Sequence, residues 1–401
     1  MLLADADAFY VSVARLVDPA GAGRARLLIV GGSAEGRGVV MSASYEARAY
    51  GVHSAMPMAR ALRLCPEAVI VPVPWEACAA KGREIRGLLE RFAPIVQQAS
   101  SDEFYLDLSG TERLYHGEPL ADTARRIRGA VLAETALSLS VGGGASRLVA
   151  KLAAGVAKPG PGRAGDGVYV VPSGAEGEFL RRFALADLPG IGPKTAARLR
   201  RLGLRTVDDV LPLDPGALAA RLGAGLGRAA EWLYRLVRGI DDTRVTPRDS
   251  AKSISRDETF ARDLVADDDL VRELAVLVER ATSDLRNAGL LARTVAVKLR
   301  DWDFTTRQAR RTLAEPVLSD RAVYAAARAL LARLRATRRV PARLLGVALS
   351  GLVYPASGPQ LELWAGADRG GIETERDRTI ARVVDTVRDR FGPAALRRGR
   401  P

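Results

Sequence analysis

The chain has 401 residues, 48% of them hydrophobic, and its 60 Lys and Arg against 47 Asp and Glu give a formal net charge of +13. The length favours two to four domains, and the charge favours a polyanionic partner such as nucleic acid, or else an Arg-rich surface without a partner. The sequence contains no run of about 18 apolar residues, which is the length needed to span a membrane. Its only cysteines, Cys65 and Cys78, are too few for a disulfide framework. We therefore expect a cytoplasmic protein that binds any metal through oxygen ligands.

In the first half of the chain, short apolar strands alternate with amphipathic helices. Residues 2–9 predict a buried strand that runs into a helix near Tyr10, and residues 26–43 predict two strands around a Gly-rich turn. Residues 97–108 predict a turn that leads into another strand. The remaining elements expected here are helices at residues 45–52, 58–64, 81–94, 122–134 and 146–158, and a strand at residues 138–145.

The second half begins after a Gly- and Pro-rich joint at residues 159–167. Residues 168–240 are predicted to be almost wholly helical, and a polar linker follows at residues 244–252. The next elements have the order β-α-β-β-α-β, which predicts the split arrangement of a ferredoxin-like unit. They are strands at residues 251–260, 291–301, 304–313 and 342–352, and helices at residues 266–288 and 320–336. A tail beyond Pro355 includes one basic amphipathic stretch.

Two acidic clusters are candidates for a metal site. Asp5 and Asp7 are two residues apart, so a strand would place both carboxylates on one face. Asp102 and Glu103 stand where the predicted turn enters a strand. Buried acids are costly unless they are paired or bound to a cation, and carboxylates are the ligands that Mg²⁺ takes. Taken singly, each cluster is better explained as a helix cap or a solvated turn.

A third cluster carries groups that suit phosphate. Tyr45 and Arg48 are three residues apart and would share a helix face, with Ser42 just before them. A hydroxyl, a phenol and a guanidinium can together hold a triphosphate. A surface helix with a packed tyrosine is the alternative.

The segment LPGIGPKTAARLRRLG, residues 188–203, predicts a helix-hairpin-helix. Its tight turn would present backbone N–H groups to a nucleic-acid phosphate without reading the base sequence. A plain turn between two helices is the alternative.

The ordered motifs DADAFY, SYEARAYGVHSAMP, SSDEFYLDL, SRLVAKLAAGVAKP and DLPGIGPKTAARL resemble those of the Y-family DNA polymerases. The resemblance implies an α+β right-hand polymerase of low fidelity that extends primers past damaged bases. Such a fold has a ferredoxin-like palm, small fingers, a helical thumb with the helix-hairpin-helix, and a β-α-β-β-α-β little finger. The expected boundaries are residues 1–10 and 75–165 for the palm, 11–74 for the fingers, 166–241 for the thumb, 242–250 for a linker, 251–353 for the little finger and 354–401 for a tail.

The resemblance also implies roles for single residues. Asp5 and Asp102 match the aspartates that bind two Mg²⁺ ions, or Mn²⁺ in their place, and Glu103 matches the third catalytic acid. Tyr10 matches the steric gate, an aromatic ring that excludes a ribose 2′-hydroxyl. Asp7 is near the site but less essential. The residues matched to those that hold the incoming deoxynucleoside triphosphate are Phe9, Tyr10, Ser42, Tyr45, Arg48 and Lys158. Ala14 departs from the glutamate that the family often carries there, for which we expect altered packing only.

The expected partners are primer–template DNA, a deoxynucleoside triphosphate and a sliding clamp, bound by a monomer. Alternation along a strand would place Lys298 and Arg300 on one face, toward DNA, although a solvated face is the alternative. The hairpin residues expected at DNA are Gly190, Gly192 and Lys194. QLELW resembles the bacterial clamp-binding peptide, and chance is the alternative. Its anchors would be Gln360, Leu361, Leu363 and Trp364.

Three other functions compete with a polymerase. A non-catalytic relative could serve as a clamp-bound scaffold, but the catalytic acids would then have no use. A helix-hairpin-helix repair accessory protein would leave the triphosphate residues without a use, and a nucleotidyl cyclase would not need the DNA-binding segments.

Overall fold

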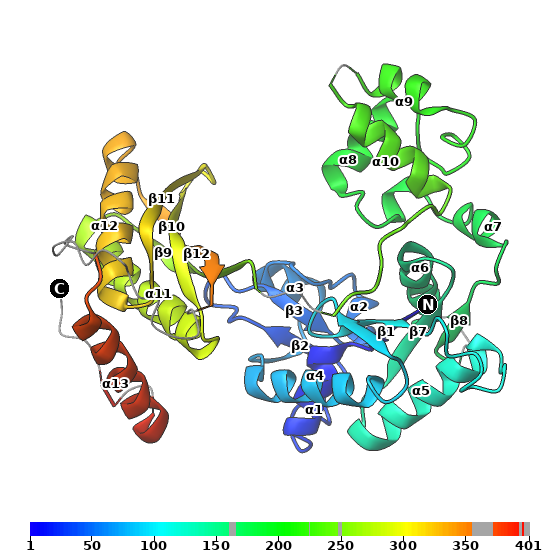
Figure 1. Ribbon diagram of the computed structural model, residues 1–401, viewed down its shortest axis with the longest axis horizontal. Coiled ribbons are helices and arrows are strands. Elements are labelled where there is room, and N and C mark those ends of the chain that lie inside the picture. Colours follow the sequence, from blue (N-terminus) through cyan, green and yellow to red (C-terminus); the bar gives the residue numbers. More distant parts are fainter. Residues whose placement is uncertain (160–165, 224, 248–250, 355–371, 393–394, 397–401) are drawn as a thin grey trace, which may run out of the picture. The chain divides into compact units, whose positions relative to one another are not determined.

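The structure is a computed structural model that describes residues 1–159, 166–223, 225–247, 251–354, 372–392 and 395–396. The chain forms two compact units, Met1–Asp249 and Ser250–Pro401 (Figure 1). Within the described residues, no helix is both long enough and apolar enough to cross a membrane. The two units are described separately.

The first unit is built on a five-stranded sheet of order β5-β6-β1-β7-β8. Its central strand, β1, is buried along its whole length and pairs antiparallel with β6 and β7. Residues alternate along it: Leu2 and Ala4 face one hydrophobic cluster and Leu3 faces another. Asp5 therefore emerges on the same face as Leu3. The strands are β5 (Ile95–Gln98), β6 (Glu103–Asp107), β1 (Leu2–Ala6), β7 (Leu139–Gly143) and β8 (Val168–Val170).

Three helices cover this sheet. α4 (Trp75–Leu89) and α5 (Leu120–Thr135) pack on the face of Leu2, and α6 (Arg147–Ala157) packs on the face of Leu3 (Figure 1). The connections β1-α4-β5 and β6-α5-β7 each enclose one other strand, so the ferredoxin-like arrangement is present. The helix predicted at residues 81–94 was misplaced, because residues 75–80 already favour a helix and the chain turns after Leu89.

A second layer of small elements is inserted between β1 and α4. It consists of the helix α1 (Phe9–Val17), the three-stranded sheet β3-β2-β4, and the short helices α2 (Tyr45–Arg48) and α3 (Met58–Leu64). The strands are β2 (Leu28–Gly31), β3 (Val40–Ala43) and β4 (Val69–Val71). The predicted strand through residue 9 is wrong at its end: β1 stops at Ala6 because Ala8 is left-handed, with φ 44° and ψ 44°.

The rest of the first unit is mostly helical. Its core is formed by α7 (Glu176–Leu180), the 3-10 turn η1 (Leu185–Asp187), α8 (Pro193–Arg201), α9 (Pro215–Leu222) and α10 (Gly227–Val237). The helical prediction was wrong for residues 168–170. They form β8, which pairs parallel with β7, because Val-Tyr-Val prefers an extended backbone at a sheet edge.

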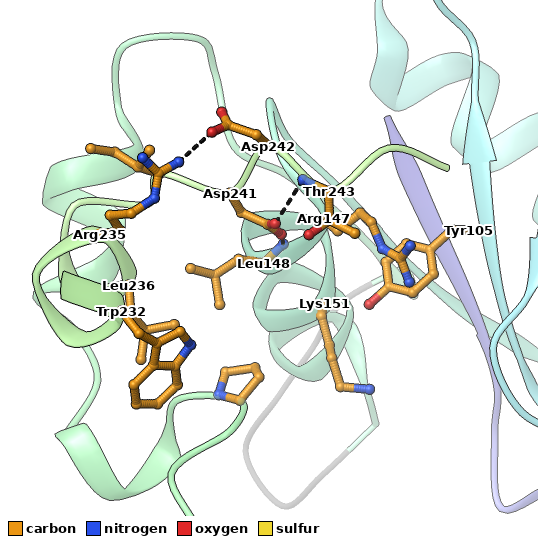
Figure 2. A pocket seen from close by; sticks show the side chains of 12 residues that line it. Tyr105, Arg147, Leu148, Lys151, Trp232, Arg235, Leu236, Asp241, Asp242 and Thr243 are labelled. Atoms are coloured by element: carbon orange, nitrogen blue, oxygen red, sulfur yellow. Dashed lines mark hydrogen bonds and ion pairs between the residues drawn. The ribbon is translucent and has the colours of Figure 1, made fainter. Parts of the chain in front are cut away.

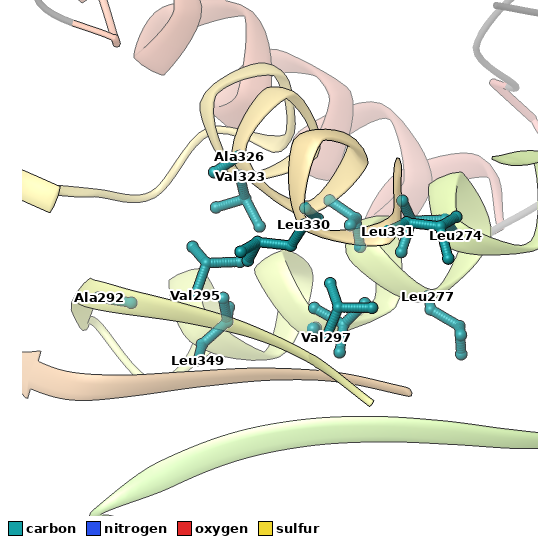
Figure 3. Packing of buried hydrophobic residues seen from close by; sticks show 14 of the residues in the cluster. Leu274, Leu277, Ala292, Val295, Val297, Val323, Ala326, Leu330, Leu331 and Leu349 are labelled. Carbon is teal, nitrogen blue, oxygen red and sulfur yellow. The ribbon is translucent and has the colours of Figure 1, made fainter. Parts of the chain in front are cut away.

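The second unit contains a four-stranded antiparallel sheet with two helices on one face (Figure 3). The predicted order β-α-β-β-α-β is confirmed, and the strand order β11-β10-β12-β9 puts β10 and β12 inside. The inner strands of the first sheet are β6, β1 and β7. The elements are β9 (Ser253–Leu264), α11 (Asp267–Asn287), β10 (Leu291–Asp301), β11 (Thr306–Val317), α12 (Asp320–Thr337) and β12 (Ala342–Val353).

A further helix, α13 (Glu375–Phe391), belongs to the second unit. Ala381 is buried in that unit's core, and Arg286 of α11 forms an ion pair with Asp385. A capping box at Thr374 starts the helix. The basic amphipathic stretch of the tail is therefore part of a folded unit. The predicted clamp peptide, residues 360–364, lies outside the described residues.

Candidate active site

A pocket of about 360 Å³ opens where the five-stranded sheet meets the inserted layer. Seven of the predicted site residues line it, which are Asp5, Phe9, Tyr10, Ser42, Arg48, Asp102 and Lys158. They come from β1, α1, β3, α2, the turn before β6 and the end of α6. Segments more than 150 residues apart in the sequence, at Asp5 and Lys158, thus converge on one small volume.

Asp5 is the most buried acid of this pocket, with 7% of its surface exposed. Its Oδ2 lies 2.8 Å from Nζ of Lys158. Burial raises the pKa of Asp5 to about 6, and the charge of Lys158 acts in the opposite direction. Asp102 and Glu103 raise this pKa further because they bring negative charge near. The site therefore concentrates carboxylates that a cation would stabilise.

The backbone of the second acidic cluster is tied to β1. Glu103 pairs with Asp5 across the sheet, and the carbonyl of Asp102 accepts the N–H of Ala6 at 2.9 Å. The carboxylate of Asp102 accepts the hydroxyl of Ser100 at 2.6 Å. The carboxylate of Glu103 turns to Lys151 on α6, at 2.7 Å. Of the residues predicted to be catalytic or to hold the nucleotide, Glu103 and Tyr45 do not line the pocket itself.

Asp7 has a different environment from Asp5. Its carboxylate accepts the hydroxyls of Ser138 and Ser140 at 2.6 Å each and that of Tyr45 at 3.4 Å. These hydrogen bonds satisfy the carboxylate of Asp7 within the protein. This is consistent with a structural role and with the expectation that Asp7 is less essential than Asp5. The expectation that Asp5 and Asp7 emerge together on one strand face is wrong, because β1 ends between them.

The predicted triphosphate cluster is partly preassembled. The guanidinium of Arg48 lies 5.0 Å from the ring centre of Tyr45, so the two share a face as expected. It donates to the carbonyl of Ala43 at 2.9 Å and to the hydroxyl of Ser42 at 3.4 Å. Burial, together with the charge of Asp7, raises the pKa of the Tyr45 phenol, which is therefore a neutral donor.

The close packing of α6 on the sheet depends on Gly142 in β7. A Cβ there would lie 2.0 Å from the backbone nitrogen of Ala154 and 2.2 Å from the carbonyl oxygen of Ala150. Only glycine permits this approach. It brings Lys151 of α6 and Lys158, the C-cap of that helix, to the acids of β6 and β1.

The donor set fits a divalent metal. Carboxylates are the hard ligands that Mg²⁺ prefers, and the buried charge of Asp5 is of the kind that a cation stabilises. Over the described ranges, no three His, Cys, Asp or Glu side chains are already gathered as a metal cluster. Lys158 and Lys151 explain this, since each draws one acid to itself. Asp5, Asp102 and Glu103 remain the residues that could hold a metal.

Several residues of the site were not predicted. Met41, His53 and Ser54 line the same pocket, and Ser54 donates to the carbonyl of Met41 at 2.9 Å. Lys151 was also missed, although its spacing to Lys158 is a usable signal. Ser138 and Ser140 had no local signal, because their contact to Asp7 depends on the pairing of β1 with β7.

A larger pocket, of about 600 Å³, lies between α6, α10 and residues 240–243 (Figure 2). Its cations already have partners. Arg235 pairs with Asp242, Lys151 with Glu103, and Arg147 stacks over Tyr105 at 4.1 Å. Because these cations already have partners, this pocket is a weaker candidate for a nucleotide.

The predicted hairpin forms a tight turn before α8. Gly190 has φ 90°, and a Cβ there would lie 2.8 Å from the ring of Trp232. Gly192 is the N-cap of α8, and Pro193 opens the helix. The first N–H groups of such a helix have no partners within the helix and can face a phosphate. Lys194 lies in the same first turn.

The open face of the second unit's sheet carries small and polar side chains. Lys298 and Arg300 lie on it, since neither belongs to the apolar cluster under the helices. Lys298 forms an ion pair with Asp257. The two strands are not neighbours, and the pair crosses β12 at Gly346, where a Cβ would lie 1.8 Å from Oδ1 of Asp257. This face therefore carries Arg300 and a Lys298 whose charge is partly neutralised by Asp257.

The chain matches models of one protein family along most of its length. Residues 4–155 match the impB/mucB/samB family and residues 251–363 match the C-terminal domain of that family. Residues 186–241 match a model described as the DNA polymerase-iota thumb domain. The chain belongs to the impB/mucB/samB family.

Relatives and solved structures agree with this assignment. A DNA polymerase IV of Halorhodospira halophila is 41% identical over 87% of this chain and 94% of its own length. One of Caulobacter vibrioides is 37% identical over 99% and 92%. A Y-family polymerase chimera, Dbh-Dpo4(243-245)-Dbh, has the same fold, with a TM-score of 0.75, 24% identity, and coverage of 88% and 99%. The Y-family resemblance and the right-hand polymerase fold are thereby confirmed, and the scaffold, accessory and cyclase interpretations are not favoured.

Proposed function

We propose that the pocket around Asp5 binds a deoxynucleoside triphosphate and two divalent metal ions, Mg²⁺ or Mn²⁺, for template-directed extension of a primer. The observation that carries this is the convergence of Asp5 and Asp102 with Ser42, Arg48 and Lys158 on one pocket. Carboxylates on one side and hydrogen-bond donors on the other are what a metal-bound triphosphate needs.

Each group has a distinct task in this reaction. Asp5 and Asp102 hold the metal ions, and Glu103 stands at the primer end. Held by these acids, the metal ions would supply the positive charge that lowers the pKa of the primer 3′-hydroxyl and neutralises the leaving pyrophosphate. Arg48 binds the triphosphate bidentately. Lys158 exchanges Asp5 for a phosphate oxygen, and the ring of Tyr10 rests under the deoxyribose and excludes a 2′-hydroxyl.

DNA is held by backbone contacts. The turn at Gly190 and Gly192, with Lys194, binds phosphates of the duplex, and Lys298 and Arg300 on the open sheet face bind others. Contacts to phosphate carry no sequence information, which suits an enzyme that copies any template. We also propose that residues 360–364 bind the sliding clamp, and that the protein acts as a monomer.

Single-nucleotide insertion on a primer–template tests the proposal. The protein should insert the complementary deoxynucleotide opposite each template base in Mg²⁺, and a nucleotide opposite an abasic site. Asp102→Ala should lose this insertion. Asp107→Asn, on the same strand as Glu103 but outside the pocket, is the matched control and should keep it. Insertion that ignores the template base would refute template direction. A variant lacking residues 360–364 should keep insertion and lose stimulation by the clamp; unchanged stimulation would refute the clamp proposal.

A further inference from the structure

The ring that faces the nucleotide sugar is connected to a catalytic acid by a short chain of hydroxyl groups. The phenol of Tyr10 and the hydroxyl of Ser101 are 2.9 Å apart. The hydroxyl of Ser101 also lies 3.4 Å from Oδ1 of Asp102. A carboxylate only accepts hydrogen bonds, so the hydroxyl of Ser101 donates to Asp102. The same hydroxyl then accepts a hydrogen bond from the phenol of Tyr10.

The Ser101 end of this chain is fixed by the backbone. The carbonyl of Asp102 accepts the N–H of Ala6, which anchors the turn to β1. On the other side α4 lies close, since a Cβ on Gly82 would be 3.1 Å from the carbonyl oxygen of Ser101. The hydroxyl of Ser101 is thus presented to Tyr10 from a rigid position.

The ring of Tyr10 is only partly buried and packs against the edges of two hydrophobic clusters, which do not fix the direction of its hydroxyl. It makes edge-to-face contacts with Phe9, at 5.4 Å between ring centres, and with Trp75, at 6.1 Å. Phe9 is buried, but Trp75 is 59% exposed and leaves one side of the ring weakly supported. A directional bond at the phenol is therefore the contact that selects one ring position.

We propose that Ser101 is a positioning residue for sugar selection, which holds the phenol of Tyr10 in place and ties the gate to Asp102. This inference rests on the proposed function and on Tyr10 as the gate. With the phenol released, the ring tilts and a 2′-hydroxyl is admitted more readily. A net hydrogen bond changes an equilibrium by about three- to tenfold, so we expect that loss in discrimination.

The test measures kcat/KM for a deoxynucleotide and for the matching ribonucleotide and takes their ratio, in which losses common to both cancel. Ser101→Ala should lower this ratio about three- to tenfold, and Ser101→Thr should restore it. Tyr10→Phe should lower it equally, and the double variant no further, because both changes remove one bond. Ser100→Ala is the matched control: it removes the other hydroxyl on Asp102 and should leave the ratio unchanged.

The outcomes separate this inference from the proposed function. If the wild type inserts deoxynucleotides and Tyr10→Ala admits ribonucleotides, the gate stands. An unchanged ratio in Ser101→Ala would then overturn the role of Ser101 alone. Equal falls in Ser101→Ala and Ser100→Ala would also overturn it, because the effect would then run through Asp102 and not through the ring.

Discussion

Replacing Asp5 with Asn should stabilise the protein while abolishing its activity. The carboxyl is buried and its pKa is raised from 3.8 to about 6. Because the folded-state pKa lies above the unfolded value, the folded protein binds the extra proton between these values, and stability falls as the pH rises through about 4 to 6. A shift of two pKa units lowers the free energy of unfolding by about 3 kcal/mol at neutral pH. Asp5→Asn removes the buried charge and therefore avoids this penalty.

Hydrogen exchange of β1 followed by mass spectrometry measures this effect locally, because that strand contains Asp5 and lies at the centre of the sheet. Without divalent ions at pH 7.5, Asp5→Asn should increase the opening free energy by up to about 3 kcal/mol. The gain should shrink as the pH falls toward 4. At pH 7.5, added Mg²⁺ should slow hydrogen exchange of β1 in the wild type and leave it unchanged in Asp5→Asn, because only the wild type retains the metal site.

Asp107→Asn is the control on the same sheet. Hydrogen bonds from Ser109 lower the pKa of Asp107, so its removal should destabilise the protein at neutral pH, with the opposite sign to Asp5→Asn. A loss of protection in Asp5→Asn at pH 7.5, or a gain independent of pH, would refute the conclusion that Asp5 carries a burial penalty.

Three further predictions concern binding and packing. Lys158→Ala should raise KM for the deoxynucleotide about tenfold through the loss of a charge-assisted bond; an unchanged KM in steady-state kinetics would remove it from the triphosphate site. Lys298→Ala removes one proposed phosphate contact and should make the dependence of log K on log salt shallower by about 0.9; an unchanged slope in DNA titrations would contradict this. Gly142→Ala places a Cβ against the backbone of α6 and should cost about 3 kcal/mol or more of stability; an unchanged urea midpoint would contradict the close packing.

The parts predicted well from the sequence have local signals. The apolar run of β1 and the alternation in β6 each depend on neighbours within one element. The order of the second unit followed from its strands of about 11 residues with turns between them. Converging acids could be anticipated because strands that pair side by side bring their ends together.

The parts that could not be predicted depend on contacts between distant segments. Asp7 binds Ser138 and Ser140, which are more than 130 residues away, and this contact depends on strand register. Ser101 meets Tyr10 across 91 residues. The end of β1 depends on a left-handed Ala8, a residue with no preference for that conformation. For α13 the sequence predicted only a basic amphipathic stretch within a tail, because its stabilising partners, such as Arg286, lie on another helix.

Primer extension in Mg²⁺ by the wild type and by Asp102→Ala tests the central claim most directly, with DNA binding measured for both. The structure predicts extension by the wild type, none by Asp102→Ala, and equal affinity of the two for primer–template, because Asp102 lines the pocket and lies outside the predicted DNA-binding turn and sheet face. Equal extension by both proteins, or none by either while DNA is bound, would contradict the assignment of this pocket as the polymerase active site.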